Sequence, residues 1–158
     1  MKINDLPSST KHRIRDTASM IRNSISVIDP FYIAKQFNID VSYIRMDEPY
    51  AFKQYNPVSE KYSIYISNTV DRYSQKILCA HELGHIFCEE PQAVSLFDHQ
   101  IDPVSEYIAN AFASLIVPFG SRFELTVDST IEEFNEYVSS LIFKKNNFFS
   151  SQKSELSN

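Results

Sequence analysis

Residues 79–88 read CAHELGHIFC and contain side chains that can together bind a metal ion. His81 and His85 are four residues apart, and on a helix such residues lie on one face about one turn apart. Two imidazole nitrogens placed in this way can ligate one Zn²⁺. Glu82 is rotated by about 100° from His81 around the helix axis. It can therefore reach a water molecule beside the metal without ligating the metal. We predict that His81 and His85 are metal ligands and that Glu82 is the catalytic base.

The alternative is that both histidines are ordinary members of a buried helix. The segment around them is apolar almost all round, which is typical of a buried helix. Burying two histidines and a glutamate without partners costs several kcal/mol. A bound metal ion removes this cost, so the pattern favours a metal site.

A zinc peptidase needs a third protein ligand and leaves the fourth position to water. The pattern H-E-x-x-H-x-x-G-x-x-H is excluded, because Pro91 stands where its third histidine would be. Glu89 and Glu90 follow the histidines too closely to fold back over the site if the helix continues. Asp98 and His99 lie in a predicted loop and could ligate, but nothing local fixes the direction of their side chains.

Glu106, in the first turns of the next predicted helix, is the preferred third ligand. A second rigid helix that crosses the first can place such a ligand accurately. Asn110 lies at i+4 on the same face and could accept the free N–H of His81 or His85, which would fix the tautomer of that ligand. The alternative for Asn110 is a solvated polar face. Gly84 costs about 1 kcal/mol relative to alanine inside a helix, which suggests the close approach of another backbone.

The elements that must position these residues follow from hydrophobic periodicity and from capping signals. We expect one domain over residues 1–143 and a flexible tail over residues 144–158. The predicted helices cover about residues 7–26, 29–37, 71–88, 102–117 and 129–143, the predicted strand covers 38–46, and the predicted hairpin covers 50–67.

The composition argues against a nucleic-acid-binding protein. The chain has 158 residues, a net charge of −5 and a pI of about 5.3, whereas nucleic-acid-binding proteins usually show a basic footprint. We interpret the one basic cluster as a solvated helix face. The cluster consists of Lys11, Arg13, Arg15 and Arg22.

No run of apolar residues approaches the length of a membrane span, and the N-terminus lacks the pattern of a signal peptide. Cys79 and Cys88 would lie about 13 Å apart along one helix and on opposite faces. This separation exceeds the reach of a disulfide. We therefore expect a reduced, cytoplasmic protein with two buried structural thiols and no membrane association.

With these residues in place, the chain resembles the ImmA/IrrE family of zinc metallopeptidases. The resemblance rests on AHELGH at residues 80–85 and on EYIANAFASLIVP at residues 106–118, and it covers about residues 5–120. It implies a compact α+β domain with a small antiparallel sheet of about three strands packed with the active-site helices. It also implies Zn²⁺ as cofactor and a helix-turn-helix repressor of a phage or mobile element as the protein substrate.

Two other functions remain open. The first is a non-proteolytic antirepressor or antitoxin-like protein, in which zinc is structural and binding alone inactivates a repressor. The second is a DNA-binding regulator, which the acidic composition disfavours.

If the chain is a peptidase, a further hydrogen-bond donor for the oxyanion is expected, worth about 3 kcal/mol. Tyr65, Tyr107 and His99 are candidates, and each is alternatively a core or surface residue. The strand at residues 62–66 could bind an extended substrate along its edge. Equally, it could be an ordinary covered strand.

Overall fold

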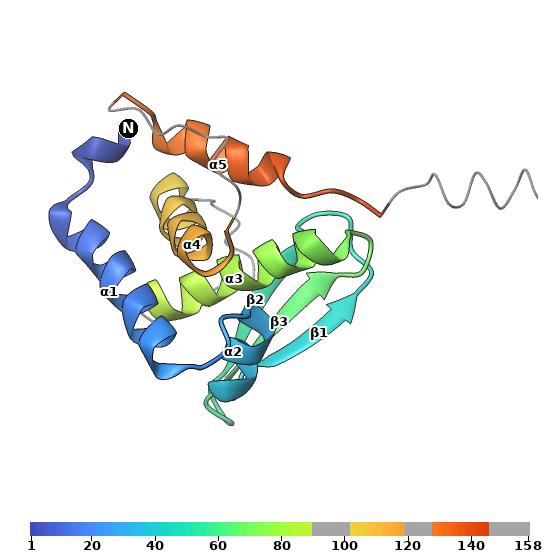
Figure 1. Cartoon of the computed structure of the whole chain (residues 1–158). Coiled ribbons are helices and arrows are strands. Elements are labelled where there is room, and N and C mark those ends of the chain that lie inside the picture. The colour runs from blue at the N-terminus through green and yellow to red at the C-terminus, as the bar shows by residue number, and fades with distance from the viewer. Residues whose placement is uncertain (90–101, 119–127, 146–158) are drawn as a thin grey trace, which may run out of the picture.

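The computed structural model describes residues 1–89, 102–118 and 128–145 (Figure 1). The α+β class and all the predicted helices and strands are confirmed, with ends that differ by a few residues. A short 3₁₀ helix at Ile3–Asp5, which the hydrophobic pattern does not predict, precedes them. The helices and strands are α1 (Ser8–Ser24), α2 (Pro30–Gln36), β1 (Asp40–Ile44), β2 (Ala51–Asn56), β3 (Lys61–Ser67), α3 (Arg72–Cys88), α4 (Pro103–Ile116) and α5 (Ile131–Ser140).

Side-chain caps define where four of the helices begin. Asp29, Asp71 and Asp102 each accept a hydrogen bond from the backbone of the first turn of α2, α3 and α4. Thr130 and Glu133 form a reciprocal capping box at the start of α5. Each cap satisfies backbone N–H groups that have no partner within the helix. These caps set the starting residue of α3 and of α4, the two helices that carry the predicted metal ligands.

The sheet has the strand order β1-β3-β2. Strands β2 and β3 form the predicted antiparallel hairpin, but β1 runs parallel to β3, so the sheet is mixed rather than antiparallel. The reason is topological. The chain leaves β1, crosses to the far edge to form β2, and then turns back to place β3 in the middle. Local pattern predicts each strand but carries no information about which strands become neighbours.

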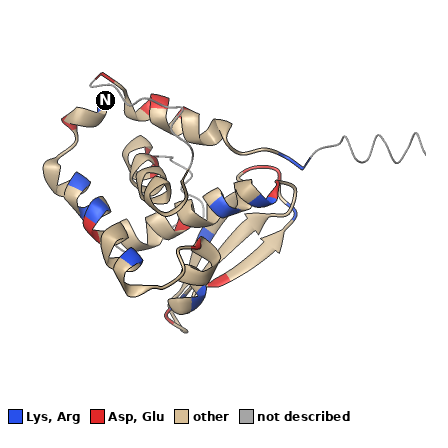
Figure 2. Ribbon diagram, in the orientation of Figure 1, with Lys and Arg blue, Asp and Glu red and all other residues tan. Residues whose placement is uncertain are grey.

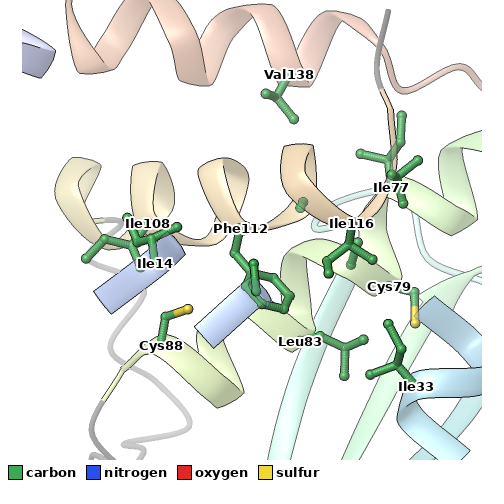
Figure 3. Packing of buried hydrophobic residues seen from close by; sticks show 14 of the residues in the cluster. Ile14, Ile33, Ile77, Cys79, Leu83, Cys88, Ile108, Phe112, Ile116 and Val138 are labelled. Carbon is green, nitrogen blue, oxygen red and sulfur yellow. The ribbon is translucent and has the colours of Figure 1, made fainter. Parts of the chain in front are cut away.

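Helices α2 and α3 pack against the sheet, and α4 packs across α3 (Figure 1). Helix α5 then packs on α4, and α1 contacts both α3 and α4. The core lies where these layers meet. Phe112 of α4 and Leu83 of α3 are fully buried there, together with Ile33 of α2 (Figure 3). Helix α3 is thus enclosed by the sheet on one side and by helices on the other.

Two short backbone pairings hold the ends of the described chain. Lys2 pairs with Thr130 next to the start of α5, and Val70 pairs with Lys144. Residues 146–158, most of the predicted tail, lie outside the described residues. None of the helices in the described parts is long enough and apolar enough to cross a membrane.

The basic cluster is a solvated face of α1, as predicted (Figure 2). Arg13, Arg15 and Arg22 are exposed. The Arg22 guanidinium donates a hydrogen bond to the backbone carbonyl of Leu115 in the last turn of α4. A cation at this place also interacts favourably with the negative end of the helix dipole.

Gly84 lies at a close approach of α3 and α4. A Cβ atom added to Gly84 would stand 2.8 Å from both the Cα and the carbonyl oxygen of Ala109 in α4. Both of these atoms belong to the backbone, so no side-chain rotation can relieve the contact. The predicted role of Gly84, the close approach of the next helix, is therefore confirmed.

We expect Gly84→Ala to reduce the free energy of unfolding by about 1–3 kcal/mol, because overpacking forces α3 and α4 apart. Helix propensity alone predicts the opposite, a gain of about 1 kcal/mol. Chemical denaturation monitored by circular dichroism decides between the two. Adding Ala109→Gly should not restore stability, because the clash involves backbone atoms that glycine retains. A variant more stable than the wild type would contradict this account of the contact.

Cys79 and Cys88 are both free and buried, as predicted. Burial raises the pKa of the Cys79 thiol well above its ordinary value, and it raises the pKa of Cys88 to about 11. The reactive form of cysteine is the thiolate. Both thiols should therefore be unreactive near neutral pH.

We expect iodoacetamide to label both cysteines of the native protein at pH 8 at least about 100-fold more slowly than a free thiol. The rate should increase with pH towards the raised pKa values, and it should reach the free-thiol rate in denaturant. Mass spectrometry of protein quenched at intervals measures both rates. Rapid labelling of the native protein would contradict the assignment of buried structural thiols.

Candidate metal centre

His81, His85 and Glu106 come together between α3 and α4. Each offers one potential ligand atom, and these atoms lie within 4.8 Å of one another. The Nε2 atoms of the two histidines are 3.1 Å apart. The Glu106 carboxylate oxygens lie 3.3 Å from Nε2 of His81 and 3.2 Å from Nε2 of His85. Ligands bound to zinc at 2.0–2.1 Å with tetrahedral angles are separated by about 3.3–3.4 Å. The spacing therefore fits a tetrahedral zinc site.

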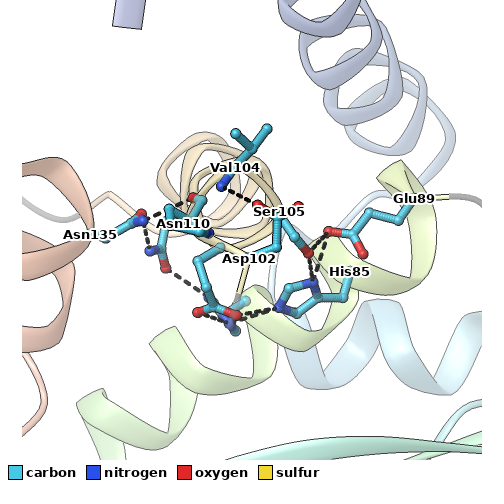
Figure 4. Close-up of polar contacts among 10 residues, drawn as sticks. His85, Glu89, Asp102, Val104, Ser105, Asn110 and Asn135 are labelled. Atoms are coloured by element: carbon cyan, nitrogen blue, oxygen red, sulfur yellow. Dashed lines mark hydrogen bonds and ion pairs between the residues drawn. The ribbon is translucent and has the colours of Figure 1, made fainter. Parts of the chain in front are cut away.

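Each imidazole is held by a hydrogen bond at Nδ1, on the other side of the ring from the Nε2 atom that lies near Glu106. Figure 4 shows His85 with its partner Glu89. His81 Nδ1 lies 2.7 Å from the side-chain oxygen of Asn110, and His85 Nδ1 lies 3.0 Å from Oε1 of Glu89. Both partners are acceptors, so each Nδ1 carries the proton. Each Nε2 can then bind a cation, either a proton or a metal ion, and the Glu106 carboxylate beside both rings favours positive charge there. The donor set thus fits a divalent metal ion.

The electrostatics of the protein chain lead to the same conclusion. Burial acts to lower the pKa of His85, but hydrogen bonds with Glu106 and Glu89 outweigh burial and raise the pKa to about 10. Burial acts to raise the pKa of Glu106, but hydrogen bonds with both histidines hold it well below its usual range. The group therefore binds positive charge strongly. A proton and a metal ion compete for the same lone pair.

Glu82 lies on α3 directly after His81 and is only 6 % exposed. Its negative charge acts on His85 and favours the protonated form of that imidazole. The carboxylate makes no hydrogen bond to another residue in the described part of the chain. Glu82 is thus close to the ligand group but is not one of its three members. The role of Glu82 as the catalytic base stays a prediction.

Asn110 lies one turn after Glu106 on α4, and its amide is held in place from α5. Its Nδ2 donates to Oδ1 of Asn135 at 2.9 Å. Asn135 Nδ2 in turn donates to the backbone carbonyl of Pro103 at 3.1 Å. These bonds orient Asn110 so that its oxygen points at His81. The sequence leaves open whether Asn110 contacts His81 or His85. The structure shows that it contacts His81.

Three residues near the ligands were not predicted to contribute. Glu89 was judged too close in sequence to act as a ligand, and it does not join the ligand group. However, it contacts Nδ1 of His85 from the other side of the ring. Its i+4 spacing from His85 is the sequence signal that could have indicated this contact. Ser105 and Asn135 contact Glu89 and Asn110 across helix interfaces, and no local pattern reveals such contacts.

Two of the proposed oxyanion donors lie elsewhere. Tyr65 stacks on Phe52 with ring centroids 4.9 Å apart. Because side chains alternate along a strand, Tyr65 points away from the face on which Ile64 and Ile66 are buried. Tyr107 is buried against Phe134 of α5. His99 and the alternative ligand Asp98 lie outside the described residues.

The suggestion that residues 62–66 bind substrate along a strand edge is wrong. These residues form β3, which is paired with β1 on one side and with β2 on the other. Both of its edges are occupied, so it is the ordinary covered strand of the alternative interpretation.

The domain resembles that of a zinc metallopeptidase. It has two histidines one turn apart on a buried helix, a glutamate on the next helix and a small sheet beside them. The model of the Peptidase_M78 family, the IrrE N-terminal-like domain, matches residues 34–118. This match covers just over half of the chain and includes the whole ligand group. The chain belongs to this family. No curated protein matches the sequence.

Removal of the Glu106 carboxylate should weaken metal binding most directly. We expect Glu106→Ala to bind Zn²⁺ at least about 100-fold more weakly than the wild type, because one of three protein ligands is lost. Competition with a chromogenic chelator measures the affinity. Glu136→Ala, which removes an exposed carboxylate on α5, is the matched control and should bind as the wild type does. Unchanged zinc stoichiometry and affinity in Glu106→Ala would remove Glu106 from the site.

Proposed function

We propose that this protein is a zinc-dependent endopeptidase that cleaves a helix-turn-helix transcriptional repressor and thereby relieves repression of a phage or mobile element. The observation that carries the proposal is the convergence of three ligand atoms beside a buried glutamate. The His81, His85 and Glu106 ligand atoms lie within 4.8 Å of one another, and Glu82 is buried and close enough for its charge to act on His85. Membership of the Peptidase_M78 family supports the same class of activity.

In this proposal His81, His85 and Glu106 hold Zn²⁺, and Glu82 carries out the proton transfers. The metal, when bound, supplies Lewis-acid chemistry that polarises a carbonyl and acidifies water. Glu82 accepts a proton from the attacking water molecule and passes it to the amine that leaves. Asn110 keeps the proton of His81 on Nδ1, so that Nε2 stays available as a ligand.

The substrate is inferred from the resemblance to the ImmA/IrrE family, in which the implied target is a repressor. A cytoplasmic location is part of the same proposal, because the repressor acts there. The ring contacts of the candidate oxyanion donors Tyr65 and Tyr107 with Phe52 and Phe134 give neither of them support for that role.

Glu82→Gln separates catalysis from metal binding. The amide keeps the size of the side chain but cannot accept a proton, so we expect the rate of repressor cleavage to fall by about 10²–10⁴-fold. Zinc content and thermal stability should remain close to those of the wild type. The assay co-expresses the chain with the repressor encoded beside its gene and follows repressor length by immunoblotting. Glu136→Gln is the matched control and should cleave normally.

Cleavage by Glu82→Gln at the wild-type rate would contradict the proposed mechanism. A Glu82→Gln protein that relieves repression while the repressor stays full length would instead favour the alternative, an antirepressor that acts by binding alone with zinc in a structural role. A reporter gene controlled by the repressor distinguishes these results in the same cells.

A further inference from the structure

Glu89 connects the two helices that carry the metal ligands. Its Oε1 accepts hydrogen bonds from Nδ1 of His85 at 3.0 Å and from the hydroxyl of Ser105 at 2.5 Å (Figure 4). His85 is on α3, whereas Ser105 is in the first turn of α4, directly before Glu106. One carboxylate oxygen thus contacts both sides of the helix pair close to the ligand group.

We propose that Glu89 is a positioning residue for the metal centre, which orients the His85 imidazole directly and aligns the Glu106 segment of α4 through Ser105. The proposal rests on the metal site of the proposed function but not on peptide cleavage. Glu89 does not belong to the ligand group itself.

The geometry gives Glu89 two separate effects. The bond to Nδ1 fixes the rotation of the His85 ring and keeps its Nε2 lone pair directed at Glu106, 3.2 Å away. The bond to Ser105 fixes the start of α4 relative to the end of α3. The donor and the acceptor of the His85–Glu89 bond are both partly shielded, since the side chains of His85 and Glu89 are only 11 % and 25 % exposed. Shielding from water strengthens such hydrogen bonds.

The two histidines are therefore supported in different ways. His81 bonds to the neutral amide of Asn110, which a chain of amide bonds fixes to α5 and to Pro103. His85 bonds to a carboxylate. Hydrogen bonds to a charged acceptor are roughly twice as strong as neutral ones, and a carboxylate partner makes a ligating imidazole more basic. Glu89 should therefore contribute to metal affinity and not only to helix packing.

The test compares Zn²⁺ affinity in Glu89→Ala, Glu89→Gln and Ser105→Ala, measured by chelator competition on the full chain. We expect Glu89→Ala to weaken binding by about 10–100-fold. Glu89→Gln should recover part of this loss, since its amide oxygen can still accept the His85 N–H. Ser105→Ala should weaken binding by a few fold. The double variant Glu89→Ala/Ser105→Ala should be no worse than Glu89→Ala, because both changes remove parts of one connection.

A spectroscopic measurement separates positioning from a purely structural role. In the Co²⁺-substituted protein, Glu89→Ala should shift the visible ligand-field bands, whereas Glu136→Ala should leave them unchanged. The His85 Nδ1–H resonance in nitrogen-15 NMR of the zinc form should lose its downfield shift in the Glu89→Ala protein. The free energy of unfolding of the metal-free variants shows whether each one is folded.

Folded Glu89→Ala with wild-type zinc affinity and an unchanged Co²⁺ spectrum would overturn the proposal. If Glu106→Ala abolishes binding at the same time, the metal site itself stands and only the positioning role fails. A third result is that Glu89→Ala loses zinc affinity as expected while the wild-type protein cleaves no repressor. This result would support the positioning role and contradict the proposed endopeptidase function.

Discussion

The close contact between α3 and α4 at Gly84 is the constraint on which the metal centre depends. A Cβ at this position would lie 2.8 Å from the backbone of Ala109, so the two helices can approach this closely only where one of them has no side chain. His81 and His85 flank Gly84 on α3, and Glu106 lies three residues before Ala109 on α4. The glycine therefore brings Glu106 within reach of the two histidines, although it costs about 1 kcal/mol in helix propensity.

The ligand group places charged and polar side chains in a region of low exposure. Two imidazole lone pairs and a carboxylate converge in a region of low exposure, and the shift in the pKa of His85 to about 10 shows how strongly the group binds positive charge. The surrounding polar contacts from Asn110 and Glu89 keep both rings in place. Functional sites commonly contain buried charged groups of this kind, and interactions with neighbouring residues compensate for the cost of burying them.

Most of the fold could be predicted because its signals are local. Capping signals predicted α2 and α4, the apolar pattern of its residues predicted α3, and alternation predicted the hairpin. The parallel pairing of β1 with β3 was missed, since the order of strands in a sheet depends on the path of the connections. For the same reason, β3 was considered a possible edge strand although it lies in the middle of the sheet.

By itself, the sequence determined the helix with its two histidines and the preference for Glu106, because residues four apart on one helix must share a face. Only the tertiary structure decided how these groups meet. The structure assigned Asn110 to His81, placed Glu89 and Ser105 behind His85, and packed the rings of Tyr65 and Tyr107 against Phe52 and Phe134. Most of these contacts join different helices or different strands. Their distances depend on how the elements pack and not on the spacing of residues along the chain.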